Sequence, residues 1–450
     1  MGLRRCTASP DTAHGALAGR RQRHDSLPRG IPPVSAAIAE QAQHMSLPLP
    51  STSICRRIRD IVVRFRPERL LEVNASIGLV TSWLLDAHEH HGFHPISHHV
   101  LDRGGKFGVI LQRLIGRFGS PEHVHLCIAE YDALPGIGHA CGHNLIAMTN
   151  IGAFLGFLAL KGNFPGEIKL IGTPAEEGGG GKISLLDKNI FDDIDISLSS
   201  HGSSNTTILW EDVPMGTGMS LATSKAIYEF YGKASHAAIN PDQGINALNA
   251  VIMLFNGIDS LRQHVKDDTR IHGIITDGGM APNIVPDFAA ADILMRSKSS
   301  SYVEYIREKI DNIAKGAALM TGAELKVREN EPGYKHVIPN TTMAKIGKSI
   351  LKELEIKLTS QPLNRFGSGA STDFGNVSHE MPSYAFNFAV SEEPVAGHST
   401  EMEKASISDL AHDNAIAISK GISATALTLL EDADQFNKSK LEFEKRKNHK

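Results

Sequence analysis

Residues 129–147 read AEYDALPGIGHACGHNLIA and join the end of an apolar run to a turn rich in glycine. The apolar residues before Glu130 predict a buried strand, and the Pro-Gly pair with the glycines after it predicts a tight loop. This loop presents Cys141 and His143 one residue apart, close in sequence to the carboxylates of Glu130 and Asp132. A segment of the hydrophobic core rarely carries so many ionisable groups. The stretch therefore predicts soft and imidazole ligands held at the end of a strand.

Strand and helix patterns alternate on both sides of this loop. Four segments have the pattern of buried strands: residues 108–111, 125–129, 167–172 and 194–199. Helical periodicity covers residues 68–88 before them and residues 144–161 between them. This alternation predicts an α/β fold with a mostly parallel sheet that is covered by helices on both faces. In such sheets, ligands gather at the carboxyl ends of the strands.

The pattern changes near residue 220, where strand, helix, strand, strand, helix and strand follow one another. These segments are residues 224–231, 244–265, 271–276, 288–295, 303–320 and 324–327. Their order is that of a small α+β, ferredoxin-like module, so we predict a smaller domain inserted into a larger one. The predicted parts are a disordered or targeting segment at 1–50, a larger domain at 55–219 and 331–430, the insertion at 220–330, and a charged, solvated tail at 431–450.

Composition argues against several classes of protein. The 450 residues carry a formal net charge of -4, whereas a nucleic-acid-binding protein normally has a basic face. The most apolar run, residues 145–160, is short and contains Thr149 and Asn150, so it predicts a buried helix and not a membrane span. The 4 cysteines of so long a chain form no disulfide framework, which indicates a reducing compartment such as the cytoplasm.

The first fifty residues hold six arginines, no lysine and three acidic residues, without apolar periodicity. Such a segment cannot bury enough surface to order itself, so we expect disorder. One alternative is a mitochondrial transit peptide, which has the same arginine-rich and acid-poor composition. Another is that translation starts at Met45, which leaves most of the segment out.

Four further stretches carry residues of the same chemical kinds: GTPAEEGGGGKIS at 172–184, LSSHGS at 198–203, GKASHAAINPDQGINALNA at 232–250 and VAGHST at 395–400. Each has a purely structural explanation when it is taken alone, because a lone cysteine is usually inert and a strand-end histidine is usually hydrogen-bonded. The glycine run is not a phosphate-binding loop. Glu176 stands where such a loop needs a glycine, and Ile183 stands where it needs serine or threonine.

Taken together, these residues favour a metal site. Thiolate, imidazole and carboxylate donors are offered by five residues: Cys141, His143, Glu177, His201 and His398. Such a set suits zinc or a similar divalent ion, and most of its members follow predicted strands. Glu176 adjoins a candidate ligand without being needed as one, which is the position that a general base should occupy.

These stretches, together with NIVPDFAAADILMR at 283–296, resemble the metallopeptidase family of aminoacylases, hippurate hydrolases and auxin-conjugate amidohydrolases. The similarity is greatest to the branch of p-aminobenzoyl-glutamate hydrolases and β-alanyl-lysine-type dipeptidases, and it covers about residues 55–425. The resemblance implies a metal-bearing catalytic domain that is interrupted by a lid, and the lid also forms the dimer interface. It further implies two zinc ions per subunit, with manganese or cobalt as alternatives.

The resemblance also implies a role for each residue of the metal centre. Cys141 bridges the two ions, and the remaining ligands are His143, Glu177, His201 and His398. Glu176 is the base that activates water and then protonates the leaving amine. Asp132 does not bind the metal itself but orients one of the ligands through a hydrogen bond.

Outside the metal centre, the resemblance makes His236 a lid residue that reaches the neighbouring subunit's site and stabilises the oxyanion. Asn283 and Arg296 help to grip the substrate carboxylate. Two features depart from the family: Glu130 stands where many relatives have a metal-binding histidine, and residues 65–76 lack the usual HPEL entry motif. Six histidines have no counterpart in the family, and we expect them on a solvated surface: His88, His90, His91, His94, His98 and His99.

We therefore predict a metal-dependent amidase or dipeptidase that cuts an amide bond in a dipeptide or an N-acyl amino acid. We expect it to act as a homodimer, with neither nucleic acid nor membrane as a partner. A cysteine hydrolase that uses Cys141 with His139 or His143 is an alternative, but the Cys-x-His spacing suits chelation better and the paired glutamates would then have no role. A catalytically inactive binding relative is another alternative, against which the intact donor set argues.

Overall fold

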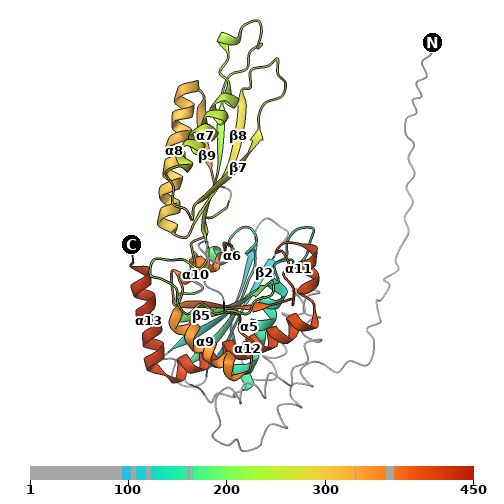
Figure 1. The fold of residues 1–450 in the computed structure, drawn as a ribbon, viewed down its shortest axis with the longest axis vertical. Coiled ribbons are helices and arrows are strands. Elements are labelled where there is room, and N and C mark those ends of the chain that lie inside the picture. The colour runs from blue at the N-terminus through green and yellow to red at the C-terminus, as the bar shows by residue number, and fades with distance from the viewer. Residues whose placement is uncertain are drawn as a thin grey trace, which may run out of the picture. The chain divides into compact units, whose positions relative to one another are not determined.

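The computed structural model describes residues 94–102, 108–117, 123–159, 164, 166–329, 331–360 and 369–449. The helix expected at 68–88 and the segment 1–50 lie outside these residues, as do His88, His90 and His91 of the histidine cluster. The other three members of that cluster lie in the first strand. The described chain forms two separate sheets with associated helices (Figure 1).

The larger sheet has six strands in the order β1-β2-β4-β3-β5-β10. Their bounds are β1 His94–Asp102, β2 Gly108–Arg117, β3 Val124–Glu130, β4 Glu167–Thr173, β5 Ile196–Ser203 and β10 Ser383–Ala389. Strands β4, β3, β5 and β10 are parallel, and β2 and β1 continue the sheet in antiparallel pairing. Every residue of β3 after its first is buried, which explains its nearly continuous apolar sequence. The expected α/β fold with a mostly parallel sheet is confirmed.

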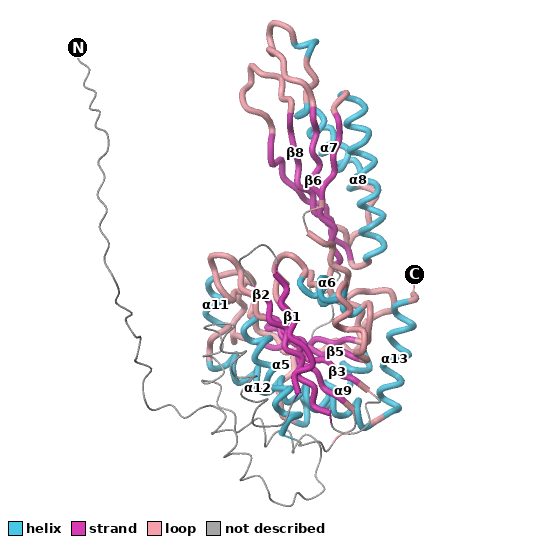
Figure 2. The backbone as a smooth tube through the Cα atoms, turned by 180° about the vertical axis from the view of Figure 1, so that it is seen from behind, coloured by secondary structure: helices cyan, strands magenta, loops and turns pink. Residues whose placement is uncertain are grey.

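Three long helices form one layer against this sheet: α5 His143–Ala159, α9 Thr341–Glu353 and α12 Asp409–Glu431 (Figures 1 and 2). Where α5 crosses α12, a Cβ on Gly152 would lie only 2.7 Å from Oγ of Ser419, so the close approach of the two helices requires glycine there. Short helices α6 Gly181–Leu186, α10 Phe374–Ser378 and α11 Thr400–Ala405 lie in the connections. No helix in the described part of the chain is long and apolar enough to cross a lipid bilayer.

The smaller sheet is antiparallel, with the order β7-β8-β6-β9. Its elements are β6 Ala222–Tyr231, α7 Ala247–Arg262, β7 Arg270–Asp277, β8 Phe288–Ser297, α8 Ser300–Thr321 and β9 Glu324–Arg328 (Figure 2). We call these elements and their connections the lid. The side chains of Asn246 and Ser299 cap the amino ends of α7 and α8, and the lid has a hydrophobic core of its own. The predicted order of elements in the inserted module agrees with this structure.

The charged segment at the carboxyl end differs from the expected solvated tail. Residues 433–447 form helix α13 (Ala433–Lys447), which packs against α9 and α12. Its apolar stripe is narrow: Phe436, Ser439 and Phe443 are buried, and the ring of Phe436 lies 3.9 Å from the ring of His123. Lysine and glutamate dominate the composition of this segment, so composition hid the helical spacing of its two phenylalanines.

Helix α13 also caps helix α9 through one carboxylate. Oε1 of Glu442 accepts hydrogen bonds from the backbone N–H of Thr341 at 2.8 Å and from its hydroxyl at 2.7 Å. Oε2 accepts from the backbone N–H and the hydroxyl of Thr342, both at 2.8 Å. The carboxylate therefore satisfies amide groups that the first turn of α9 would otherwise leave without partners.

We expect Glu442→Ala to lower the free energy of unfolding by about 1 to 2 kcal/mol, the usual cost of losing a helix cap. Equilibrium denaturation with urea measures this change. Glu444→Ala is the matched control, because Glu444 is an exposed residue of the same helix. Equal stability of the two variants would contradict a capping role for Glu442.

Candidate metal centre

The carboxyl ends of the parallel strands bring the five predicted ligands together. Cys141 and His143 follow β3, and His143 is the first residue of α5. Glu177 lies in the turn after β4, and His201 is near the end of β5. His398 lies in the loop between β10 and α11, and its backbone N–H donates to the carbonyl of Ala140 at 2.9 Å. The centre is thus built from four neighbouring strand ends.

The donor atoms form two groups that share Cys141. In one group, donor atoms of Cys141, His143 and His201 all lie within 4.8 Å of one another, and in the other so do those of Cys141, Glu177 and His398. Sγ of Cys141 is 3.6 Å from Nε2 of His201, and Nε2 of His398 is 3.6 Å from Oε2 of Glu177. Ligands of a tetrahedral zinc ion are about 3.3 to 3.8 Å apart, because each bond is about 2.0 to 2.3 Å long. The spacing fits two adjacent ions that share a thiolate.

Two buried atoms of this centre have no hydrogen-bond partner among the described residues, and they face each other. They are Nε2 of His143 and Oε1 of Glu177, which are 3.7 Å apart. Buried polar atoms of this kind are rarely left without a partner, and 3.7 Å is too long for a hydrogen bond between them. A cation between the two atoms satisfies both. The residues present therefore fit a metal ion.

Asp132 lies behind His143 and sets its orientation. Nδ1 of His143 donates to Oδ1 of Asp132 at 3.3 Å, and the backbone N–H of Glu177 donates to Oδ2 at 2.9 Å. Burial opposes ionisation of Asp132, but these hydrogen bonds lower its pKa to about 2. One ionised carboxylate thus holds an imidazole and the neighbouring turn, and it directs Nε2 of His143 toward the centre.

In the protein chain alone, the pKa values of both His143 and Cys141 are raised. Burial would lower the pKa of His143, but the hydrogen bond to Asp132 and the neighbouring Cys141 sulfur and Glu130 carboxylate raise it to about 11. Burial also raises the pKa of the Cys141 thiol to about 11. A cysteine nucleophile needs the opposite shift, so this environment does not support a cysteine hydrolase. A divalent cation can replace the protons at both groups.

His201 presents a lone pair to the centre. Its Nδ1 lies 2.6 Å from the carbonyl of Gly202, so Nδ1 carries the proton and donates it there. In the neutral imidazole, Nε2 is then the nitrogen without a proton, and it faces the sulfur of Cys141. The tautomer that the backbone selects is therefore the one that a metal ligand needs.

Glu176 has the environment of a general base. Its side chain is buried, and burial together with the charge of Glu130 raises its pKa to about 7. The residue before it, Ala175, has a left-handed backbone with φ 60°, and Tyr334 Oη donates to the carbonyl of Glu176 at 2.8 Å. His398 likewise has φ 58°. Strained backbone at both positions indicates that the surrounding structure holds them in place.

Two charged residues of this site were missed by sequence reasoning. Lys182 and Asp373 are both fully buried, and Nζ of Lys182 is 2.6 Å from Oδ1 of Asp373 and 2.8 Å from Oε1 of Glu130. Lys182 follows the four glycines of the run at 178–181, and the sequence predicts no role for it. A lysine placed a few residues after two candidate site carboxylates was the available signal. No local pattern marks Asp373, which is 191 residues away in sequence.

A cavity of about 440 Å³ opens beside the metal centre. One part of this cavity is lined by Cys141, Glu176 and Glu177. Another part is lined by Arg296 of the lid. Arg296 donates to Oγ of Ser371 at 3.0 Å, and no carboxylate of the described residues lies within ion-pair distance of its guanidinium. The cavity therefore combines an acidic metal centre with a cation that is available to an anionic group.

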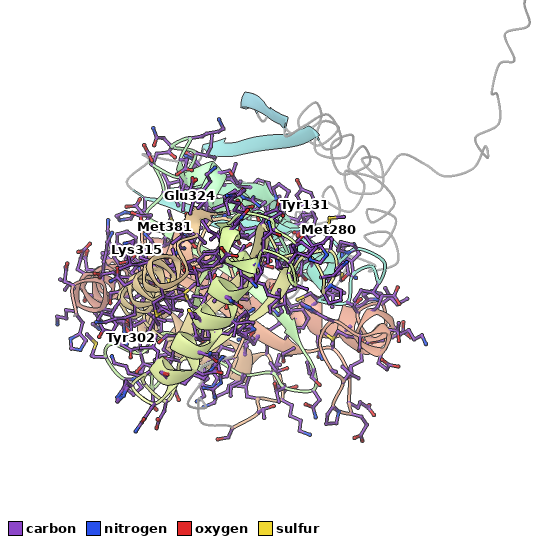
Figure 3. The ribbon with its side chains drawn as sticks, turned by 90° about the horizontal axis from the view of Figure 1, so that it is seen from above. Tyr131, Met280, Tyr302, Lys315, Glu324 and Met381 are labelled. Carbon is purple, nitrogen blue, oxygen red and sulfur yellow. The ribbon has the colours of Figure 1, made fainter. Side chains whose placement is uncertain are left out.

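His236 and Asn283 are not among the residues that line this cavity. Both are exposed lid residues, and their loops are joined by a hydrogen bond from the N–H of Ala237 to the carbonyl of Asn283 at 3.1 Å. Nδ1 of His236 accepts from two backbone N–H groups of its own loop, which leaves Nε2 directed away from that turn. Met280, labelled in Figure 3, is 96% exposed near these loops. The two residues therefore form one surface.

The sequence and fold match known peptidases and amidohydrolases. Residues 126–417 match the model of peptidase family M20/M25/M40. The Xaa-Arg dipeptidase of Mus musculus is 34% identical over 307 residues, which cover 67% of this chain and 69% of that protein. One of the subunits of the p-aminobenzoyl-glutamate hydrolase of Escherichia coli is 32% identical over 259 residues, 52% of each chain.

Solved structures show the same fold at low sequence identity. A dinuclear metal-binding peptidase of the M20 family from Bacillus subtilis gives a TM-score of 0.58 at 16% identity, over 81% of this chain and 98% of that one. Aminopeptidase PepT from Bacillus cereus gives 0.53 at 17% identity, over 80% and 99%. These structures agree with this chain in fold, whereas the family is established by the family model, which spans the larger part of the sequence, and by the 34% identical dipeptidase. The chain belongs to peptidase family M20/M25/M40 and is an amide-bond hydrolase.

Proposed function

We propose that this enzyme uses two divalent ions, zinc in the first instance, to hydrolyse the amide bond that links an acyl group to an amino acid with a free carboxylate. The observation that carries the proposal is the pair of donor groups that share Cys141, with the buried carboxylate of Glu176 beside them. A metal site alone can be structural. A metal site with an extra buried carboxylate and an adjoining cavity is suited to hydrolysis.

The chain's own residues divide the chemistry as follows. A divalent ion in such a centre supplies Lewis acidity, which lowers the pKa of water and polarises an amide carbonyl. Cys141, His143, Glu177, His201 and His398 are the residues that would hold the two ions. Glu176 takes the proton from the attacking water on its carboxylate and returns it to the nitrogen of the leaving amine.

The substrate carboxylate binds at the cationic part of the cavity. Arg296 offers a guanidinium to a planar carboxylate, and Ser371 beside it is a further hydrogen-bonding group. The named relatives support a substrate of this kind, because Xaa-Arg and p-aminobenzoyl-glutamate are both amino acids joined through an amide to another group. We place Asn283 and His236 at the same substrate, but from the lid of a second subunit.

A homodimer formed by the lid accounts for surface features that a single subunit leaves exposed. Strand β7 is at an edge of the lid sheet, and Ile274 and Ile275 on it are 64% and 46% exposed. An edge strand with exposed isoleucines is prone to uncontrolled pairing unless another chain covers it. A second copy of the lid would cover β7 and bring the His236 loop to its neighbour. The thiols of Cys127 and Cys141 are unpaired, which supports a cytoplasmic enzyme.

We expect chelation to abolish hydrolysis, and zinc, manganese or cobalt to restore it. The purified protein is assayed with dipeptides that end in arginine, with other dipeptides, and with p-aminobenzoyl-glutamate and further N-acyl amino acids. Metal content is measured on the same samples. Cys141→Ser should lower both metal content and activity, because serine is a poor substitute for a thiolate ligand. Full activity in completely metal-free protein, abolished by alkylation of Cys141, would instead identify a cysteine hydrolase.

A further inference from the structure

Three carboxylates approach one atom of the metal centre at the same distance. Nε2 of His143 is 3.7 Å from Oε2 of Glu130, 3.7 Å from Oε2 of Glu176 and 3.7 Å from Oε1 of Glu177. By distance and chemistry alone, each of them is placed to bind an ion held by His143. Glu130, His143 and Glu176 even form a third group of donors within 4.8 Å of one another. Distance therefore does not decide which carboxylates are ligands.

Glu130 differs from the other two in having an ammonium partner. Its Oε1 lies 2.8 Å from Nζ of Lys182, and only its Oε2 is left to face His143. Lys182 is itself held firmly, since Oδ1 of Asp373 binds its ammonium at 2.6 Å and Oδ2 accepts its backbone N–H at 2.9 Å. Lys182 and Asp373 are both 0% exposed. In such a buried setting, an ion pair of this geometry fixes the orientation of Glu130.

The glycine run at 178–181 is what brings Lys182 to this place. Gly180 has φ +62°, a left-handed conformation that favours glycine. A Cβ on Gly181 would lie 1.8 Å from the carbonyl oxygen of Pro174, so the chain folds back against its own turn more tightly than any side chain allows. The run therefore reverses the chain directly after Glu177 and places Lys182, the second residue of α6, beside the carboxylates. The four glycines of the GGGGK motif thus allow the tight turn that brings Lys182 to Glu130.

We propose that Lys182, held by Asp373, is a positioning residue that keeps Glu130 from becoming a metal ligand. The proposal rests on the metal-dependent function proposed above. A catalytic metal centre must keep coordination positions open for water and substrate, whereas a centre filled by protein ligands is a structural one. Glu130 is close enough to fill such a position. The ammonium engages one of its oxygens and holds the carboxylate back, while Glu177 binds and Glu176 stays free to accept a proton.

The competing explanation is that Lys182 merely neutralises buried charge. Removing Lys182 alone does not separate the two, because Asp373 would be left buried without a partner and the protein could unfold. The double variant Lys182→Met, Asp373→Asn removes the ammonium and its main counter-charge together. Glu130 is then released beside the metal ions in a protein that carries no new uncompensated aspartate.

We expect the double variant to retain two metal equivalents and to lose about 10- to 100-fold in kcat, the range typical of changing residues just outside the ligands of a metal site. The visible spectrum of the cobalt-substituted protein should change, because it reports coordination number, and KM should change little. Adding Glu130→Gln to the double variant should recover most of the lost kcat and the wild-type cobalt spectrum. A residue that only neutralised charge would give neither the spectral change nor the recovery.

The single variant Glu130→Gln makes the test independent of how well the double variant folds. Its amide oxygen can still accept from Lys182, and the proposal requires that it keep two metal equivalents. A loss of metal from this variant would show that Glu130 is a ligand and overturn the proposal. An unchanged cobalt spectrum in the double variant, or no recovery on adding Glu130→Gln, would also overturn it. A wild-type protein that binds no metal at all would instead refute the proposed function on which it rests.

Discussion

Glu176→Gln is expected to lower kcat by about 100- to 10,000-fold while metal content and fold stay as in the wild type. Glutamine has nearly the same size and can occupy the same buried place, but it cannot take a proton from water. The contact that anchors this turn is unaffected, because Tyr334 donates to the backbone carbonyl of Glu176 and not to its side chain. Steady-state kinetics with the best substrate of the panel, together with metal analysis, measures the effect.

Glu177→Gln is the matched control for this prediction. It makes the same chemical change one residue away, at the carboxylate whose buried Oε1 faces Nε2 of His143. A neutral amide is a poorer ligand, so this variant should lose metal as well as activity. If Glu176→Gln kept near-wild-type kcat, another group would be the base. If both variants lost metal equally, the division between base and ligand would be wrong.

His236→Ala should lower kcat by about 100- to 1,000-fold, the usual cost of removing one donor to a developing oxyanion. His236 is exposed and belongs to no metal group in the described structure, so metal content should stay at the wild-type level. Thermal stability should change little, because the side chain accepts hydrogen bonds only from the N–H groups of Ala238 and Ile239 in its own loop. His264→Ala is the control, since His264 is another exposed histidine of the lid.

Mixed dimers test whether His236 acts on the neighbouring subunit. A dimer with one His236→Ala subunit and one Glu176→Gln subunit keeps one complete site only if His236 works across the interface. Such a dimer, co-expressed and purified through two different tags, should recover up to about half of the wild-type activity, because a twofold dimer has two equivalent sites. A mixed dimer as inactive as its two parents would show that His236 acts within its own chain or not at all.

The sequence predicted local structure well where one pattern dominated. The lid strand expected at 288–295 is β8, and the buried helix expected at 144–161 is α5, because alternation and apolar length are local properties. Helix α13 was hidden by its composition, since its buried face consists of few residues among many charged ones.

The sequence predicted the donor residues of the candidate site but not their arrangement in space. Cys141, Glu177 and His398 offered the donor types of a metal centre, but their meeting depends on the order of strands in the sheet, which spacing does not reveal. The pair Lys182 and Asp373 depends on the same long-range arrangement and had no local signal at the aspartate. Sequence patterns could therefore name donors more readily than the ion pair that sets the place of Glu130.

The division of the chain around the lid has a consequence for biosynthesis. The lid core is drawn from one continuous stretch, 222–323, whereas the core of the larger sheet joins residues on both sides of that stretch. Folding units with local contacts form early, and domains fold as units while the ribosome is still adding residues. The lid can therefore fold on the nascent chain before β10 has emerged to pair with β5. Because His398 follows β10, the donor group of Cys141, Glu177 and His398 can assemble only after that late pairing, so the candidate metal centre is completed near the end of synthesis.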